Sequence, residues 1–228
     1  MLTCTHAPSP PSLPLTPPPL PSWWSTPSAT PEWLAACQAE LPDLRAFAAC
    51  VFHHGIPPPH RKRAWLILLG VVRYGQSQCD VDAKLKTLQE TYEQLSHKLE
   101  TFVTSTELGE ELAHFQQQQD GIHFDVLRCD REFFSLAQDL DNDGKALDLE
   151  AAQASMRSIL SVYALLHRYP GYFQGMSDLL EPLVSVLQDE AIAFHAFVAY
   201  MMYASPRFDT TAEDGTQVRG GCRSGLRH

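Results

Sequence analysis

Residues 158–187 read SILSVYALLHRYPGYFQGMSDLLEPLVSVL, and this stretch decides the fold. Apolar side chains recur at spacings of three and four on both sides of its Pro170-Gly171 pair, which is typical of two helices separated by a break. The apolar faces consist of Met156, Ile159, Leu160, Tyr163 and Leu166 before the break, and of Met176, Leu179, Leu180, Leu183 and Leu187 after it. No stretch of the sequence alternates convincingly in the manner of a half-buried strand. We therefore predict an all-α protein.

The neighbouring segments continue the helical pattern. Residues 191–203 are apolar almost all round, with Asp189 as a suitable N-cap before them and Pro206 as a stop after them. Upstream, apolar residues at alternating gaps of three and four form a stripe from Leu85 to Phe102. The stripe is shorter than three heptads, so it favours a helix packed within the domain over an independent coiled coil.

By composition, the chain divides into three parts. Residues 1–54 begin with a stretch that holds ten of the 17 prolines and continue with a short Ala-rich helical lead-in. Residues 55–211 are the predicted helical domain, which starts with a short helix closed by Gly70. Residues 212–228 contain four glycines and three arginines and little apolar surface. We expect the proline-rich start and the Gly/Arg-rich end to be disordered.

Charge and cysteine usage limit the class of protein. The net charge of −10 argues against a nucleic-acid-binding protein. The six cysteines are widely spaced and contain no CxxC pair, which favours reduced thiols in the cytoplasm. The longest apolar run is shorter than the ~20 residues that span a bilayer, and the first residues do not resemble a signal peptide. We expect a cytoplasmic protein. Any recruitment to endomembranes would take place through its partners.

Three short clusters occur in order along the predicted domain. They are Gly55-Ile56-Pro57 with Arg61-x-x-x-Trp65, then Ile122-x-x-Asp125-x-x-Arg128, and finally Tyr172-x-Gln174-Gly175. Together they resemble the TBC family of Rab GTPase-activating proteins, whose patterns include RxxxW, IxxDxxR and YxQG. The resemblance extends over residues 55–209 and implies a helical TBC-type domain.

This resemblance implies that Arg128 and Gln174 are the catalytic residues of a GTPase activator. GTP hydrolysis spreads negative charge over the γ-phosphoryl oxygens, and an inserted guanidinium offers permanently charged donors that match phosphate geometry. A glutamine can accept from an attacking water and donate to it without titrating. The partner, a Rab-family small GTPase, would hold both GTP and magnesium. The sequence has no P-loop motif, so we expect no cofactor of the chain's own.

Six further residues have supporting roles in this interpretation. They are Asp125, Tyr172, Gly175, Ile122, Arg61 and Trp65. We expect Asp125, one helical turn before Arg128, to hydrogen-bond and orient that arginine. Tyr172 is expected to pack beneath Gln174, and Gly175 to permit close backbone approach. The two residues of the first cluster are interpreted as structural, with the tryptophan in the core.

An alternative to an active enzyme regulator stays open. After Thr211 the character of the sequence changes abruptly, and we expect the domain to lack the C-terminal helices with which family members complete their core. A catalytically inactive, truncated TBC interaction protein would keep both Arg128 and Gln174 without stimulating a GTPase. The proline-rich tail suggests an SH3-type partner, but residues 1–44 contain no lysine or arginine to anchor such a ligand, so none is expected.

A competing motif lies between the second and third clusters. Residues 139–150 (DLDNDGKALDLE) satisfy the calcium-loop pattern of an EF-hand. The ligands would be Asp139, Asp141, Asp143 and Glu150. Against this, Ala146 stands where a paired hand has a branched apolar residue, and the sequence contains no second loop. We expect a solvated acidic loop and no metal, with a calcium-binding regulatory protein as the third interpretation.

Overall fold

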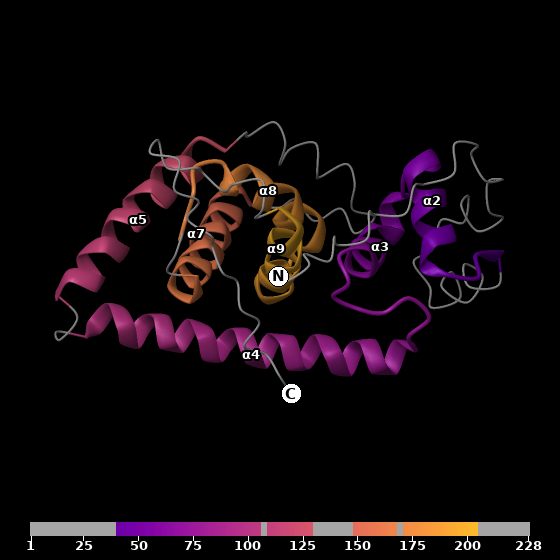
Figure 1. Ribbon diagram of the computed structural model, residues 1–228, viewed down its shortest axis with the longest axis horizontal. Coiled ribbons are helices and arrows are strands. Elements are labelled where there is room, and N and C mark those ends of the chain that lie inside the picture. Colours follow the sequence, from indigo (N-terminus) through magenta and orange to yellow (C-terminus); the bar gives the residue numbers. More distant parts are fainter. Residues whose placement is uncertain (1–39, 106–108, 130–147, 168–170, 205–228) are drawn as a thin grey trace, which may run out of the picture. The chain divides into compact units, whose positions relative to one another are not determined.

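The computed structural model describes residues 40–105, 109–129, 148–167 and 171–204 (Figure 1). Its elements are α2 (Leu44–His54), the 3₁₀ turn η2 (Pro58–His60), α3 (Arg61–Leu68), α4 (Gln78–Thr104), α5 (Gly109–Leu127), α7 (Leu149–Leu166), α8 (Met176–Leu187) and α9 (Glu190–Ala204). All elements in these ranges are helical, which confirms the predicted all-α class. The chain divides into two compact units, Met1–His60 and Arg61–His228.

In the first unit, α2 begins two residues after the helix-breaking Pro42. The Asp43 side chain caps the helix by accepting a hydrogen bond from the Ala46 amide at 2.8 Å. At the other end, Gly55 has a φ of 80° and its amide donates to the Val51 carbonyl at 2.9 Å. This helix agrees with the predicted lead-in. The proline-rich start of the chain and its Gly/Arg-rich end lie outside the described residues.

Helix α7 is the central element of the second unit, since it contacts α4, α5, α8 and α9. Met156, Ile159 and Leu160 are completely buried on it, as their spacing predicts. The prediction that Leu166 shares this buried face is wrong, because that side chain is 45% exposed. Leu166 is the last residue of α7, so no further turn of the helix packs beside it.

Helices α8 and α9 pack against each other and against α7. Helix α9 is apolar on all sides, and its Phe194 and Phe197 are buried, as expected for a helix surrounded by others. The predicted N-cap is confirmed, since Asp189 accepts a hydrogen bond from the Ile192 amide at 2.9 Å. In the part of the chain that the structure describes, no helix is long and apolar enough to cross a membrane.

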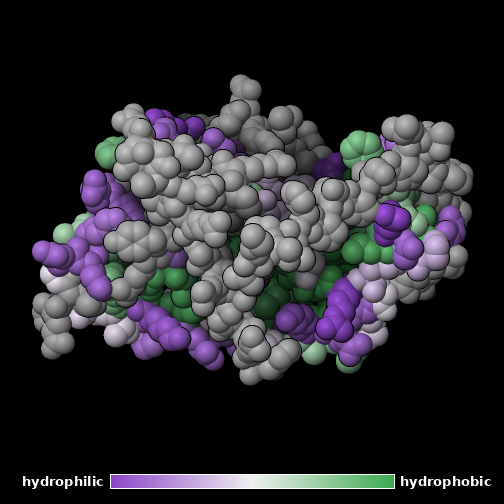
Figure 2. Space-filling view, in the orientation of Figure 1, coloured by the Kyte–Doolittle hydropathy of each residue, from purple (hydrophilic) through white to green (hydrophobic). Residues whose placement is uncertain are grey.

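Helix α4 packs along α7 and α9, which confirms the predicted helix packed within the domain. Of its apolar stripe, Tyr92 is buried and the other residues are half-buried. Its 27 residues make it about 40 Å long. Two polar contacts hold it to α9: the Tyr92 hydroxyl donates to Glu190 at 2.7 Å, and His195 Nε2 lies 2.9 Å from the Leu88 carbonyl oxygen. The outer face is polar, and hydrophilic residues line the lower edge of Figure 2, where α4 runs in Figure 1.

Helix α3 ends at Leu68 and is closed two residues later by a glycine, as predicted. Gly70 has a φ of 74°, and its amide donates to the Ile67 carbonyl at 3.0 Å. Trp65 is half-buried, so its expected place in the core is only partly realised. The buried residues of this short helix are Ala64, Leu66 and Ile67.

Helix α5 carries the second sequence cluster and contacts α7 and α8. Its apolar side is formed by Phe115, Ile122 and Val126, all of which are buried. The third cluster occupies the loop that leads into α8, and Gly175 in a left-handed conformation is the last residue before that helix. Because α5 contacts α8, the fold brings the second and third clusters together.

Candidate functional site

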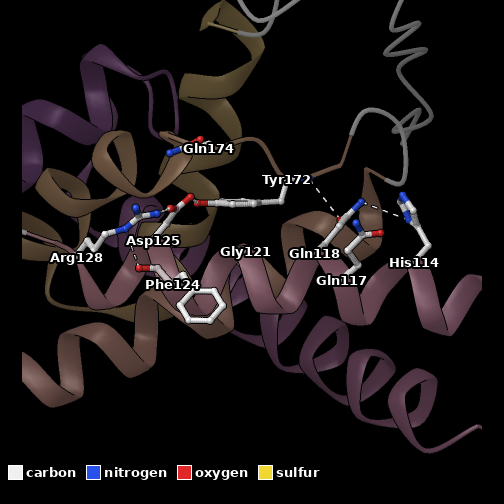
Figure 3. Close-up of a pocket in the computed structure, with 9 residues that line it drawn as sticks. All are labelled: His114, Gln117, Gln118, Gly121, Phe124, Asp125, Arg128, Tyr172 and Gln174. Atoms are coloured by element: carbon white, nitrogen blue, oxygen red, sulfur yellow. Dashed lines mark hydrogen bonds and ion pairs between the residues drawn. The ribbon is translucent and has the colours of Figure 1, made fainter.

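One face of α5 lines an open groove of about 490 Å³. The groove residues are His114, Gln117, Gln118, Gly121, Phe124, Asp125 and Arg128 from α5 and its end, with Tyr172 and Gln174 from the loop before α8 (Figure 3). Spacings of three and four residues place the first group on one side of the helix. The groove therefore contains the polar residues of both motifs, including the two predicted catalytic residues.

Arg128 follows directly after the last residue of α5. Its amide donates to the Asp125 carbonyl at 3.1 Å, which tightens the final turn. Its Nε donates to the Phe124 carbonyl at 3.2 Å, and its Nη2 is paired with Asp125 Oδ1. The predicted contact between Asp125 and Arg128 is therefore present. The arginine side chain is 66% exposed and the aspartate only 10%, so a nearly buried carboxylate holds an accessible guanidinium.

Tyr172 connects the loop before α8 to the arginine helix. Its hydroxyl donates to Asp125 Oδ2 at 2.7 Å, so Asp125 binds Arg128 through one oxygen and Tyr172 through the other (Figure 3). Burial, and next the bond to Asp125, raise the pKa of the Tyr172 hydroxyl. The hydroxyl thus stays protonated at neutral pH and remains a donor. The sequence predicts that Tyr172 packs beneath Gln174. In the structure, Tyr172 lies against α5 and its hydroxyl contacts Asp125, which the sequence does not predict.

The backbone at the start of this loop approaches α5 closely. Gly171 has a φ of 81°, and a Cβ added there would lie 2.3 Å from Gln118 Nε2 and 2.9 Å from Gln118 Oε1. The Tyr172 amide donates to Gln118 Oε1 at 3.4 Å. Only glycine combines this backbone conformation with such a short distance to a neighbouring side chain.

Gln174 is exposed at the groove, and its amide lies above the Asp125 carboxylate in the view of Figure 3. Two contacts join the residues on either side of Gln174 and Gly175. The Phe173 amide lies 3.4 Å from Met176 Sδ, and the Met176 amide donates to the Phe173 carbonyl at 3.1 Å. Gly175 has a φ of 91°, and a Cβ added there would meet nothing within 4 Å. Within this chain, the need for glycine at that position is therefore conformational.

Cys129 follows Arg128 in the sequence and is buried, with 6% of its surface exposed. Burial, followed by the nearby carboxylates of Glu181, Asp178 and Asp125, raises the pKa of its thiol to about 12. Its Sγ lies 3.7 Å from the Asp125 carbonyl oxygen. Because a thiol with such a raised pKa is protonated at neutral pH, Cys129 is a packing residue and a poor nucleophile.

The other predicted residues lie outside the groove. Ile122 is 1% exposed and anchors α5 to the core beneath it. Arg61 and Trp65 lie in α3 and do not line the groove. Of the proposed calcium ligands, only Glu150 is described; it lies in the first turn of α7, whereas residues 139–143 fall outside the described residues. Among the described residues, no group of three or more His, Cys, Asp or Glu side chains is arranged to hold a metal ion.

A family model describes the chain over most of its length. The model of the Rab-GTPase-TBC domain matches residues 58–219, which include α5, the groove loop and all of α7 to α9. The chain belongs to this family. The TBC domain thus contains the arginine of IxxDxxR and the glutamine of YxQG at one groove, with Asp125 and Tyr172 joining the two motifs.

Curated relatives of this TBC domain include proteins from fungi and mammals. GTPase-activating protein GYP7 of Yarrowia lipolytica is 32% identical over 165 residues, which cover 66% of this chain and 22% of that protein. TBC1 domain family member 17 of Mus musculus is 29% identical over 165 residues, covering 72% of this chain and 24% of that protein. TBC1 domain family member 25 of Mus musculus is 29% identical over 158 residues, covering 69% and 19%. The chain spans less than a quarter of the length of these relatives.

Several groove residues of the TBC domain are not specified by the sequence motifs. Phe124, at an unspecified position of the second cluster, projects from α5 with 62% of its surface exposed. Four others precede that cluster on the same face of α5: His114, Gln117, Gln118 and Gly121. Gln118 belongs to a run of four glutamines, which has no apolar periodicity and so gives no signal of its own. Gly171 could have been identified as a special position, because a Pro-Gly pair marks a turn that requires a positive φ.

Proposed function

We propose that this TBC domain is a GTPase-activating protein for a Rab-family small GTPase. The observation that carries the proposal is the meeting of Arg128 and Gln174, one from the end of α5 and one from the loop before α8, at a single open groove. Four fungal relatives of this chain bear the name GTPase-activating protein GYP7, which supports the same activity.

Arg128 supplies the charge stabilisation in this mechanism. Its exposed guanidinium enters the nucleotide site of the partner and donates to the γ-phosphoryl oxygens as negative charge develops there. An arginine of this type accelerates hydrolysis by about 10³- to 10⁵-fold, which corresponds to roughly 4–7 kcal/mol of barrier. A lysine would keep the charge but lose the planar fork of donors.

Gln174 positions the attacking water. Its side chain is exposed and uncharged, so its carbonyl can accept from water while its amide group donates. The partner GTPase holds the GTP and the magnesium ion, and the TBC domain contributes the two side chains in trans. Asp125 orients the guanidinium from one side of the groove, because it is nearly buried and already paired with Arg128.

The proposal is tested by single-turnover hydrolysis with a panel of GTP-loaded Rab-family GTPases. We expect at least one member to be stimulated by the chain, and Arg128→Ala to reduce that stimulation by about 10³-fold or more. Arg128→Lys is expected to restore only a small part of it. Gln174→Ala should also lower the maximal rate, without a matching loss of affinity for the GTPase.

Arg73 provides a matched control, because it is an exposed arginine that does not line the groove. Arg73→Ala should stimulate hydrolysis as well as the unmodified chain. Circular dichroism should show the same helix content for all variants. Full stimulation by Arg128→Ala, or no stimulation of any panel member by the folded chain, would contradict the proposed function.

A further inference from the structure

Four consecutive glutamines, Gln116 to Gln119, occupy the middle of α5, and the structure gives them different surroundings. Gln116 is exposed and does not line the groove, whereas Gln117 lines it and is also exposed. Gln119 accepts a hydrogen bond from the Ser161 hydroxyl of α7 at 2.6 Å. Gln118 is half-buried and lies between the groove and the loop that carries Gln174. The run is therefore a set of distinct positions rather than a uniform polar surface.

Gln118 contacts the first two residues of that loop. Its Oε1 accepts the Tyr172 amide at 3.4 Å, and the backbone of Gly171 lies so close that a Cβ there would collide with the whole amide group. On its other side, Gln118 Nε2 lies 3.5 Å from His114 Nδ1 (Figure 3). The amide of Gln118 is thus held between its own helix and the loop.

Tyr172 is attached to α5 at both of its ends. Its backbone amide is bound by Gln118, and its hydroxyl is bound by Asp125, seven residues further along the helix. Seven residues of α-helix span about 10.5 Å. Between the two attachments, the ring passes over Gly121, where an added Cβ would be 3.9 Å from two ring carbons. The tyrosine therefore lies along two turns of the helix that carries Arg128.

We propose that Gln118 is a positioning residue that sets the location of Gln174 relative to Arg128. The inference rests on the proposed function, in which these two side chains act on the same γ-phosphate. Gln118 touches neither GTP nor water in this scheme. It holds the backbone end of Tyr172, two residues before Gln174, so that the loop cannot pivot about the Tyr172–Asp125 bond.

The expected effect on catalysis follows from the geometry. When Gln118 is replaced by alanine, the hydroxyl of Tyr172 still binds Asp125, but the loop backbone loses its contact with α5. A misplacement of about 1 Å in a catalytic group can reduce a rate by ~10²-fold. We expect Gln118→Ala to lower the maximal rate of stimulated hydrolysis by about 10-fold or more, while the GTPase concentration for half-maximal rate changes little.

A double-mutant cycle with Gln174 separates positioning from a general effect on the fold. In a Gln174→Ala background the loop no longer carries the side chain to be positioned, so Gln118→Ala should have no further effect. Gln116→Ala is the matched control, since it removes a glutamine from the same run that faces solvent. Equal losses from Gln118→Ala in both backgrounds would overturn the inference. If Gln174→Ala itself leaves the rate unchanged, the failure lies in the proposed function.

Hydrogen exchange of the full chain tests the contact independently of activity. We expect Gln118→Ala to increase the exchange of the backbone amides of residues 172–174, and Gln116→Ala to leave it unchanged. Gln118→Glu keeps an acceptor oxygen and should restore most of the protection. Unchanged exchange in Gln118→Ala would overturn the inference whether or not the chain stimulates a GTPase.

Discussion

Replacing Gly171 by alanine should destabilise the groove loop for two separable reasons. The first is backbone conformation, because a left-handed φ of 81° costs a residue with a Cβ roughly 1–2 kcal/mol. The second is collision, because the new Cβ would lie 2.3 Å from Gln118 Nε2. Since that atom ends a flexible side chain, the amide can move away and lose its bond to the Tyr172 amide. A hydrogen bond of this kind contributes about 0.5–1.5 kcal/mol. The expected total loss is therefore about 1.5–3.5 kcal/mol in the free energy of unfolding.

The two costs are distinguished by urea unfolding followed by circular dichroism. Gly175→Ala is the reference for backbone strain, because Gly175 has a φ of 91° and open space around it. It should lose only the conformational part, roughly 1–2 kcal/mol. In a Gln118→Ala background the collision disappears, so Gly171→Ala should there cost about as much as Gly175→Ala.

One outcome in particular would refute this reasoning. If Gly171→Ala costs the same free energy of unfolding with and without the Gln118 side chain, the two residues are not coupled. The close approach of the loop to α5 would then be irrelevant to stability. A cost for Gly171→Ala well below that of Gly175→Ala would refute the conformational part as well, because both glycines have left-handed backbones.

Two further predictions concern the hydrogen bond between Asp125 and Tyr172 and the lowered pKa of His195. Asp125→Ala leaves the partly buried Tyr172 hydroxyl without its acceptor and should lower the free energy of unfolding by about 1–3 kcal/mol, whereas Asp125→Asn keeps an acceptor and should cost less in the same urea titration. Burial, together with the charge of Lys84, lowers the pKa of His195, so the unfolded chain binds its proton more readily than the folded one. The free energy of unfolding should therefore fall as the pH decreases below the ordinary histidine pKa of about 6.5. His195→Gln should reduce this fall between pH 7.5 and 5.5, and an unchanged pH dependence would contradict the assignment.

The helices could be predicted because their signals are local. Periodic apolar residues identified the buried sides of α7 and α8. Asp189 was recognisable as an N-cap because capping uses a short side chain just before the first turn. Leu166 is less buried than predicted, because periodicity does not show where a helix stops packing against its neighbours. Trp65 is half-buried, because the residue type alone does not show which side of α3 faces the core. The approach of Asp125 to Arg128 was predictable for the same local reason, since three residues make almost one turn.

The contact between Gln118 and the loop could not be predicted from the sequence. Gln116, Gln117, Gln118 and Gln119 are chemically identical, and their differences come only from the direction in which each projects from α5 and from what the fold brings to that side. Gln119 meets α7 and Gln118 meets a loop more than fifty positions away in the chain. Such pairings depend on the tertiary arrangement, which helical periodicity does not contain.

The contacts that hold Arg128 are weak compared with the effect proposed for it. Its guanidinium is 66% exposed, and its partners are the Phe124 carbonyl and the Asp125 carboxylate. An ion pair exposed to this degree contributes about 0–1 kcal/mol. An arginine acting on a γ-phosphate in its transition state contributes roughly 4–7 kcal/mol. Exchanging the Phe124 carbonyl for phosphate oxygens therefore costs little, and Asp125 can keep its own bond to Tyr172 while the guanidinium moves. In the proposed mechanism, these contacts hold the arginine near the γ-phosphate without competing with the phosphate oxygens for it.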